Sequence, residues 1–162
     1  MRKIAVVMMT LLVVACATID CPVQNTVYTI YHLKKAGGSA DTLKTDTLTI
    51  VTRRADDTLT QLNQLHGVTA FSFKLPISYT QPEDVLYFEL KDKDGGIWLD
   101  TIRIKKDNEP HFESVDCQLA YFHTITEVST THHAIDSIVV NNPYVNYDAK
   151  KEHFHLYFKA VR

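Results

Sequence analysis

The chain has 162 residues, and its 17 Lys and Arg against 19 Asp and Glu give a formal net charge of −2 at pH 7. This mild acidity argues against a nucleic-acid partner, which would require a clustered basic face. Hydrophobic residues make up 45% of the chain, enough for one domain with its own apolar core.

The first fifteen residues have the features of an export signal. Arg2 and Lys3 precede an apolar run over 4–14, and the small residue Ala15 stands directly before Cys16. A basic start, a short apolar run and a small residue at the cleavage point are typical of a secretory signal. A cysteine directly after that point predicts a bacterial lipoprotein, lipidated at Cys16. The alternative is an ordinary secretory signal in which Cys16 is incidental.

We therefore predict a signal peptide over 1–15, a lipidated anchor and short tether over 16–24, and a single domain over 25–162. The apolar run is shorter than the roughly 20 residues that a transmembrane helix needs. No polybasic stretch is present to hold anionic lipid. Attachment would depend on acyl chains, and because one chain binds only marginally, we expect two or three.

Cys21 and Cys117 remain as an even pair in an exported chain, which predicts a disulfide between them. Such a bond would close a long loop and contribute on the order of 4 kcal/mol in the chain-entropy treatment. The alternative is that Cys117 acts as a nucleophile beside His111 or His123. No family signature surrounds it, so the disulfide is the preferred interpretation.

Short runs rich in Val, Ile, Thr, Phe and Tyr dominate the rest of the chain and predict β-strands. They cover 27–33, 48–52, 68–75, 85–90, 97–104, 120–126, 135–140 and 154–158. In the last run, alternation predicts that Phe154, Leu156 and Phe158 face the core. His153, His155 and Tyr157 would then face solvent.

Glycine-containing turns at 36–39 and 92–96 separate some of these runs, and the second predicts a hairpin. Connections this short favour antiparallel pairing. We therefore predict an all-β fold, an antiparallel, immunoglobulin-like or similar β-sandwich of about seven to nine strands. A small β-barrel of the lipocalin type is the alternative.

An Asp followed by Thr or Ser and an aliphatic residue recurs in the chain. It begins at Asp41, Asp46, Asp57, Asp100 and Asp136. An Asp side chain can bond nearby backbone amides in a turn, which accounts for the pattern. Calcium binding is the alternative, and it requires several of these oxygens to converge.

Two histidines are weak candidates for a metal site. His153 and His155 are two residues apart on a predicted strand, so both could reach one ion. A third ligand would have to come from Glu152, His132 or His133. We favour solvated histidines on an outer sheet face, and we expect no cofactor.

No catalytic signature is present: the chain contains no nucleophile elbow, phosphate-binding loop or dinucleotide fingerprint. A glycosidase needs only two carboxylates, so Glu83, Asp84, Glu89 and Glu113 leave that possibility open. The chain shows little material for a deep cleft. We expect a protein that is not an enzyme.

Five segments resemble a family of small lipoproteins from Bacteroides-type bacteria that is classed as a domain of unknown function. They are 78–84 (SYTQPED), 110–117 (PHFESVDC), 122–126 (FHTIT), 135–138 (IDSI) and 151–155 (KEHFH), and the resemblance runs from Cys21 through the last strand. It implies an envelope lipoprotein with a β-rich domain and supplies no ligand or catalytic residue. In such bacteria a run of acids after the lipidated cysteine marks surface display. Residues 17–20 (ATID) lack that run, which favours the periplasmic side of the outer membrane.

The favoured function is a non-enzymatic interaction or structural module of the cell envelope, attached to the membrane by its lipid anchor and contacting another envelope protein. Candidate contact residues are Trp98, Tyr144, Tyr147 and the face formed by 153–157. The alternative is a small-ligand binder, for a metal or a glycan whose identity the sequence leaves open. The single Trp argues against a stacking platform for sugars.

Overall fold

The computed structural model describes residue 21 and residues 26–44, 46–54, 57–66, 71–148 and 150–159. The predicted signal peptide and the predicted lipid site Cys16 lie outside these residues. Within the part described, no helix is long and apolar enough to span a bilayer.

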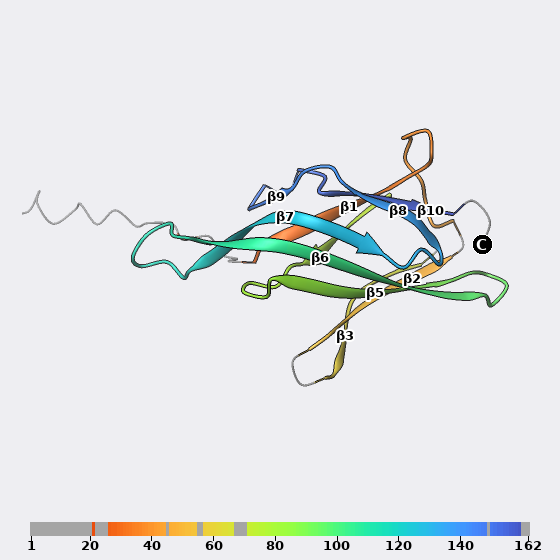
Figure 1. Cartoon of the computed structure of the whole chain (residues 1–162), viewed down its shortest axis with the longest axis horizontal. Coiled ribbons are helices and arrows are strands. Elements are labelled where there is room, and N and C mark those ends of the chain that lie inside the picture. Colours follow the sequence, from red (N-terminus) through yellow and green to blue (C-terminus); the bar gives the residue numbers. More distant parts are fainter. Residues whose placement is uncertain are drawn as a thin grey trace, which may run out of the picture.

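The described residues form ten strands in two sheets (Figure 1). The four-stranded sheet has the order β4-β1-β10-β8, with β1 (Tyr28–Lys34), β4 (Ser72–Pro76), β8 (Ile135–Val140) and β10 (Phe154–Phe158). The six-stranded sheet has the order β3-β2-β5-β6-β7-β9, with β2 (Thr47–Arg53), β3 (Leu59–His66), β5 (Glu83–Lys91), β6 (Ile97–His111), β7 (Ala120–Thr130) and β9 (Tyr144–Val145). The all-β, sandwich-like architecture predicted from the sequence is confirmed.

Most neighbouring strands pair antiparallel, as the short connections predict. The exception is β1 with β10, which are parallel, with Tyr31 opposite Phe154 and Leu33 opposite Leu156. A parallel pair needs a long connection, and here the connection is nearly the whole domain. The first and last strands of the fold are therefore neighbours at the centre of one sheet.

Residues buried along alternate positions explain why the strands form and where they pack. On β6, Ile102 and Ile104 are fully buried whereas Arg103 and Lys105 are exposed. This alternation continues beyond the predicted end at residue 104, and β6 reaches His111. Together β6 and β7 make the longest hairpin of the described chain, which extends to the left in Figure 1.

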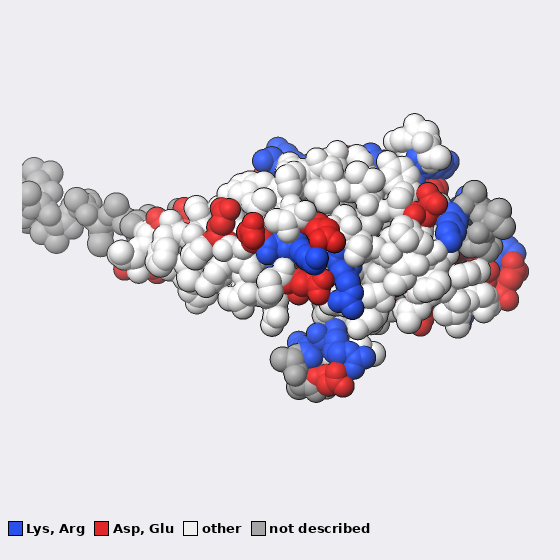
Figure 2. Space-filling model, in the orientation of Figure 1, with Lys and Arg blue, Asp and Glu red and all other residues white. Residues whose placement is uncertain are grey.

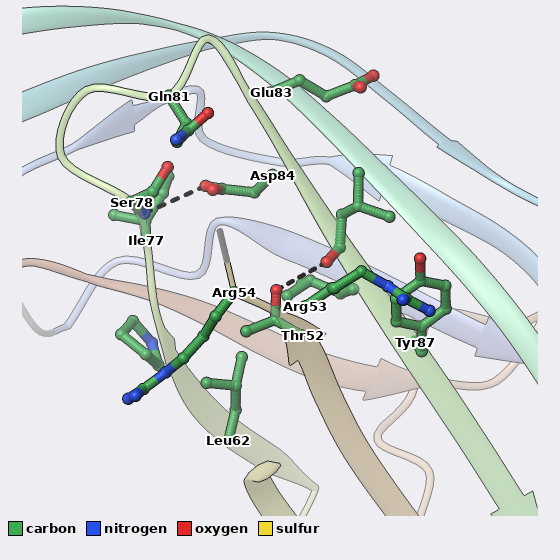
Figure 3. A pocket seen from close by; sticks show the side chains of 13 residues that line it. Thr52, Arg53, Arg54, Leu62, Ile77, Ser78, Gln81, Glu83, Asp84 and Tyr87 are labelled. Atoms are coloured by element: carbon green, nitrogen blue, oxygen red, sulfur yellow. Dashed lines mark hydrogen bonds between the residues drawn. The ribbon is translucent and has the colours of Figure 1, made fainter. Parts of the chain in front are cut away.

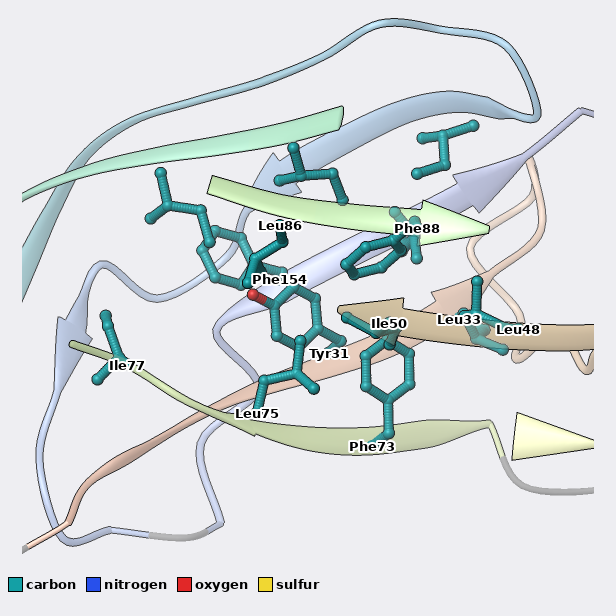
Figure 4. Packing of buried hydrophobic residues seen from close by; sticks show 14 of the residues in the cluster. Tyr31, Leu33, Leu48, Ile50, Phe73, Leu75, Ile77, Leu86, Phe88 and Phe154 are labelled. Atoms are coloured by element: carbon teal, nitrogen blue, oxygen red, sulfur yellow. The ribbon is translucent and has the colours of Figure 1, made fainter. Parts of the chain in front are cut away.

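The core lies between the two sheets and is centred on Tyr31, which is fully buried (Figure 4). Its ring stacks on Phe73 with centroids 5.0 Å apart and on Phe154 at 4.8 Å, and Phe88 from the other sheet lies at 6.2 Å. Aromatic pairs of this kind contribute about 1 kcal/mol each beyond the area they bury. Tyr31 thereby joins strands of both sheets, and its burial raises the pKa of its hydroxyl.

The turn at 92–96 forms the predicted hairpin between β5 and β6. Asp92 Oδ1 accepts hydrogen bonds from the backbone amides of Asp94 at 2.9 Å and Gly96 at 2.7 Å. Gly95 has φ of 91°, a conformation that residues with a Cβ rarely adopt. This turn and the turn at the end of β6 lie at opposite ends of the molecule (Figure 1).

Two strands were not predicted. β3 carries polar residues on both faces, and β9 has only two residues, so neither shows the apolar pattern of a strand. The run predicted over 68–75 corresponds to β4, which begins at Ser72, and residues 67–70 lie outside those described.

Candidate functional site

A groove of about 570 Å³ opens where the edge strands β3 and β4 of the two sheets approach each other (Figure 3). Apolar side chains on one side are Leu62 from β3, Pro76 from β4 and Ile77. Val85 and Leu86 of β5 also line the groove, and the rest of the lining is formed by charged and polar side chains. They are Thr52, Arg53, Arg54, Ser78, Gln81, Glu83, Asp84 and Tyr87. A groove with an apolar side and a charged side can hold an extended segment of another chain.

Hydrogen bonds fix the walls of this groove. Asp84 accepts a bond from the Ser78 backbone amide at 3.3 Å, and Thr52 donates to the Val85 carbonyl at 2.9 Å (Figure 3). Arg53 is held by Asp57, with an N–O distance of 2.6 Å. The Asp84 and Thr52 bonds therefore fix part of the polar side of the groove, whereas the Arg53–Asp57 pair is exposed to solvent.

A fully buried lysine, Lys106 on β6, lies behind the loop that forms this wall. Its Nζ donates to the Ser78 carbonyl at 2.8 Å, the Gln81 carbonyl at 2.5 Å and Asn108 Oδ1 at 2.9 Å. The Ser78 hydroxyl lies at 3.1 Å, and Asp84 Oδ2 is 3.8 Å away. Lys106 thus pins loop 78–81 to the six-stranded sheet.

Burial lowers the pKa of Lys106 below its ordinary value, and the Asp84 carboxylate opposes this effect. A lysine with a lowered pKa can serve as a nucleophile when its amine is free. Here oxygen acceptors take up the ammonium protons, and the side chain has no exposed surface. The arrangement supports a role for Lys106 in holding the groove rather than in chemistry.

Asn108 extends this network to His123 on β7. Its Oδ1 lies 2.8 Å from His123 Nδ1, and its Nδ2 donates to the Gln81 carbonyl at 3.1 Å. Since Oδ1 can only accept, His123 donates through Nδ1 and its Nε2 is an acceptor. That Nε2 is buried without a hydrogen-bond partner among the described residues. Burial and then the Lys106 charge lower the pKa of His123 to about 4, so His123 is neutral at pH 7.

The two predicted metal ligands, His153 and His155, lie in different environments. His153 is fully buried, and its Nδ1 accepts a hydrogen bond from the Ile30 backbone amide at 3.0 Å. Burial lowers the pKa of His153, although the Tyr144 backbone opposes this effect. The expectation that His153 faces solvent is wrong, because its ring completes the hydrogen bonding where β1 and β10 begin to pair.

His155 lies on the outer side of the four-stranded sheet in an ion-pair cluster around Glu152. Glu152 contacts His155 at 2.8 Å, His32 at 3.3 Å and Lys34 at 3.3 Å. Among the residues described, no group of three or more His, Cys, Asp or Glu is arranged to hold a metal ion. His132 and His133, the other proposed ligands, bond the carbonyls of Asp136 and Leu99.

Cys21 and Cys117 form a disulfide, with Cα atoms 5.4 Å apart, as predicted. The alternative that Cys117 is a nucleophile is wrong, because its sulfur is bonded. The histidines named with it have other contacts. His111 stacks on Phe122 with ring centroids 4.0 Å apart, and His123 bonds Asn108.

The carboxylates considered for calcium binding or glycoside hydrolysis have separate partners. Asp100 accepts backbone hydrogen bonds, and Asp57 pairs with Arg53. Glu83 pairs with Arg103, and Glu113 with His111. Asp57 and Glu113 bond residues close to them in the sequence, whereas Asp100 bonds residues 131–135 and Glu83 bonds Arg103 on the neighbouring strand β6.

The predicted surface aromatics differ in exposure. Trp98 and Tyr147 are partly buried and pack against the core, whereas Tyr144 is exposed and meets Phe122 edge to face at 6.1 Å. Lys106 was not predicted as a site residue. Its signal was the alternation Ile102, Ile104, Lys106, which places a lysine on the buried face of β6.

A family model described as a family of unknown function (DUF6452) matches residues 47–158, which run from the first residue of β2 to the last residue of β10. No curated protein and no solved structure matches the chain. The family description names no ligand, activity or location. Lipidation and a Bacteroides-type source therefore stay predictions from the sequence.

Proposed function

We propose, from the premise that the chain belongs to the DUF6452 family of unknown function, that it is a lipid-anchored, non-enzymatic interaction module of a bacterial cell envelope. The anchor is Cys16, and the favoured location is the periplasmic side of the outer membrane. The partner is another envelope protein, which the module binds at the groove between β3 and β4.

The observation that carries this proposal is the disulfide between Cys21 and Cys117. Disulfides persist in exported proteins and are rare in a reducing cytosol. The bond also leaves Cys16 as the remaining cysteine of the three, directly after the small residue Ala15. Cys16 would then carry the lipid, and the disulfide would stabilise the domain, as in an exported lipoprotein.

The groove supports the choice of a protein partner. It lies between two edge strands, and the outer edges of β3 and β4 have no neighbouring strand in the described sheets. An unpaired edge can add a strand from another chain through backbone hydrogen bonds. Leu62 and Pro76 would bury apolar side chains of the added segment, and Arg54 or Glu83 would select its charges.

The anchor is tested by mass spectrometry of the mature N-terminal peptide after expression in a bacterium that processes lipoproteins. We expect cleavage before Cys16 and an acylated cysteine. The Cys16→Ala variant should lose the acyl mass and leave the membrane fraction. An unmodified N-terminus at another residue would overturn the lipoprotein proposal.

The partner is tested with a photo-crosslinking amino acid placed at Leu62, inside the groove, in intact cells. We expect one discrete crosslinked protein, and we expect the crosslink to weaken in the Cys16→Ala background. The matched control position is Val139, which is 48% exposed on the far edge strand β8. Equal crosslinking at both positions, or none at Leu62, would contradict binding at the groove.

A further inference from the structure

Large apolar side chains are exposed at the end of the β6–β7 hairpin, in residues 112–119, which we call the hairpin tip. Val115 is 94% exposed, Phe112 68% and Leu119 39%. Single exposed apolar residues are normal, but several on one short tip indicate a surface that contacts a membrane or another protein.

The disulfide ties this hairpin tip to the residues that follow the proposed anchor. Cys117 belongs to the tip, and its partner Cys21 is five residues after Cys16. Five residues span at most about 18 Å when fully extended. A lipid on Cys16 would therefore hold Cys21 within that distance of the bilayer surface, and the Cα of Cys117 in the tip lies 5.4 Å from that of Cys21.

The charge near the tip decides which lipid it fits. From Asp107 to Asp148 the sequence contains no Lys or Arg, whereas Asp107, Glu109, Glu113 and Asp116 are acidic. Figure 2 shows Asp and Glu but no Lys or Arg over this end of the described molecule. Attraction to anionic headgroups needs basic residues. The tip is thus suited to a zwitterionic surface that it enters through its apolar side chains.

Tyrosines surround the base of the hairpin tip. Tyr79 stacks with Tyr121 at 6.2 Å, and Tyr147 meets Phe122 at 5.0 Å. Tyr79 and Tyr144 remain 42% and 36% exposed. Tyrosine is enriched at the level of lipid headgroups because it has an apolar ring and a polar hydroxyl.

From these observations we infer that the hairpin tip is a membrane-contact surface, and that Phe112, Val115 and Leu119 enter the headgroup region of a zwitterionic bilayer. This inference rests on the proposed lipidation of Cys16. It gives the domain a second contact with the membrane and a fixed orientation. The opposite end of β6, with the turn at 92–96, then points away from the bilayer.

The test uses the acylated full chain in vesicles of phosphatidylcholine and phosphatidylethanolamine whose acyl chains carry bromine, a quencher of tryptophan fluorescence. In one variant Trp98→Phe removes the native tryptophan and Phe112→Trp places a probe at the tip. The matched control combines Trp98→Phe with Ile97→Trp. Ile97 is 60% exposed at the other end of β6, on the order of 45 Å away. Trp98→Phe with Val115→Trp is a second tip variant.

We expect brominated lipid to quench the tip probes and shift their emission to the blue, and to leave the probe at residue 97 unchanged. The intact mass of the same samples reports acylation. Acylated protein without quenching at residues 112 and 115 would overturn the membrane contact and leave the proposed function standing. Protein without the acyl group at Cys16 would overturn both. Equal quenching at both ends of β6 would also overturn the inferred orientation.

Discussion

The backbone amide of Ala134 donates a 2.7 Å hydrogen bond to Asp100 Oδ2 and so joins β6 to the loop that leads into β8. The same carboxylate accepts from the amides of His133 at 2.6 Å and Ile135 at 2.9 Å, and from the Thr131 hydroxyl at 2.9 Å. This loop carries the chain from the six-stranded to the four-stranded sheet. One buried carboxylate therefore fixes the crossing between the layers.

Asp100→Asn should destabilise the fold by about 3 kcal/mol, because the buried carboxylate that accepts these charge-assisted hydrogen bonds is lost. In either orientation of the new amide, its NH₂ group would face backbone N–H groups that need an acceptor. The free energy of unfolding, measured with urea, checks this. Asp107→Asn, on an exposed position of the same strand, is the control and should change stability little.

The stability difference between wild type and Asp100→Asn should depend on pH. Burial raises the pKa of Asp100, but the hydrogen bonds from His133, Ile135, Ala134 and Thr131 outweigh it and lower the pKa below the ordinary value of 3.8. Because the folded pKa lies below the unfolded pKa, the stabilisation is complete above pH 3.8 and is lost as the pH falls through the folded pKa. The stability gap between wild type and Asp100→Asn should therefore narrow in acid. A gap that widens below pH 4 would contradict this account.

Sequence patterns predicted the strands that have one apolar face, and they failed where the reason for a strand is not local. β3 is an edge strand whose residues Thr60, Gln61, Asn63 and Gln64 are polar, so only its pairing with β2 makes it a strand. In the parallel pairing of β1 and β10, Tyr31 lies opposite Phe154 on the neighbouring strand of the same sheet, and the two rings stack. No short window of sequence contains both residues.

Lys106→Met should destabilise the fold by about 3 kcal/mol, since breaking a buried charge network leaves its partners uncompensated. The Ser78 and Gln81 carbonyls would lose a donor, and Asp84 would lose its buried counter-ion. Urea unfolding measures the loss. Lys105→Met is the control, because Lys105 is exposed and pairs with Glu127 at the surface, where ion pairs contribute little. Equal effects of the two substitutions would refute the role of Lys106.

In the candidate site, the burial of individual side chains could not be predicted from residue spacing. His153 and His155 share the spacing of a metal pair, yet one is buried against the Ile30 amide and the other pairs with Glu152. Burial of His153 depends on how β10 is placed beside β1, which spacing alone does not reveal. Lys106 was readable, because it continues an alternation of buried residues, but a lysine at such a position is ordinarily assigned to the surface.

His123→Asn should remove a pH dependence from the stability of the protein. The folded pKa of His123 is about 4 and its ordinary value is 6.5, so the unfolded chain binds the proton more readily. The stability contribution is complete above pH 6.5 and falls by on the order of 3 kcal/mol as the pH drops towards 4. Asn retains a donor for Asn108 and does not titrate. Urea unfolding at pH 7, 5.5 and 4 should show a shallower decline than wild type, and an equally steep decline would contradict the role of His123.

Removal of the disulfide should lower the free energy of unfolding without changing the fold. Cys21 and Cys117 are 96 residues apart, and freeing a loop of that length costs about 5 kcal/mol in the chain-entropy treatment. Cys21→Ser should therefore unfold at a lower urea concentration than oxidised wild type, and reduced wild type should match the variant. Both strands next to the hairpin tip are held by other pairs, including His111 with Ala120, so the circular dichroism of the folded state should not change. If reduction left the urea midpoint unchanged, the tip would be fixed by the β6–β7 ladder alone, and the bond would serve only to tether the residues after Cys16.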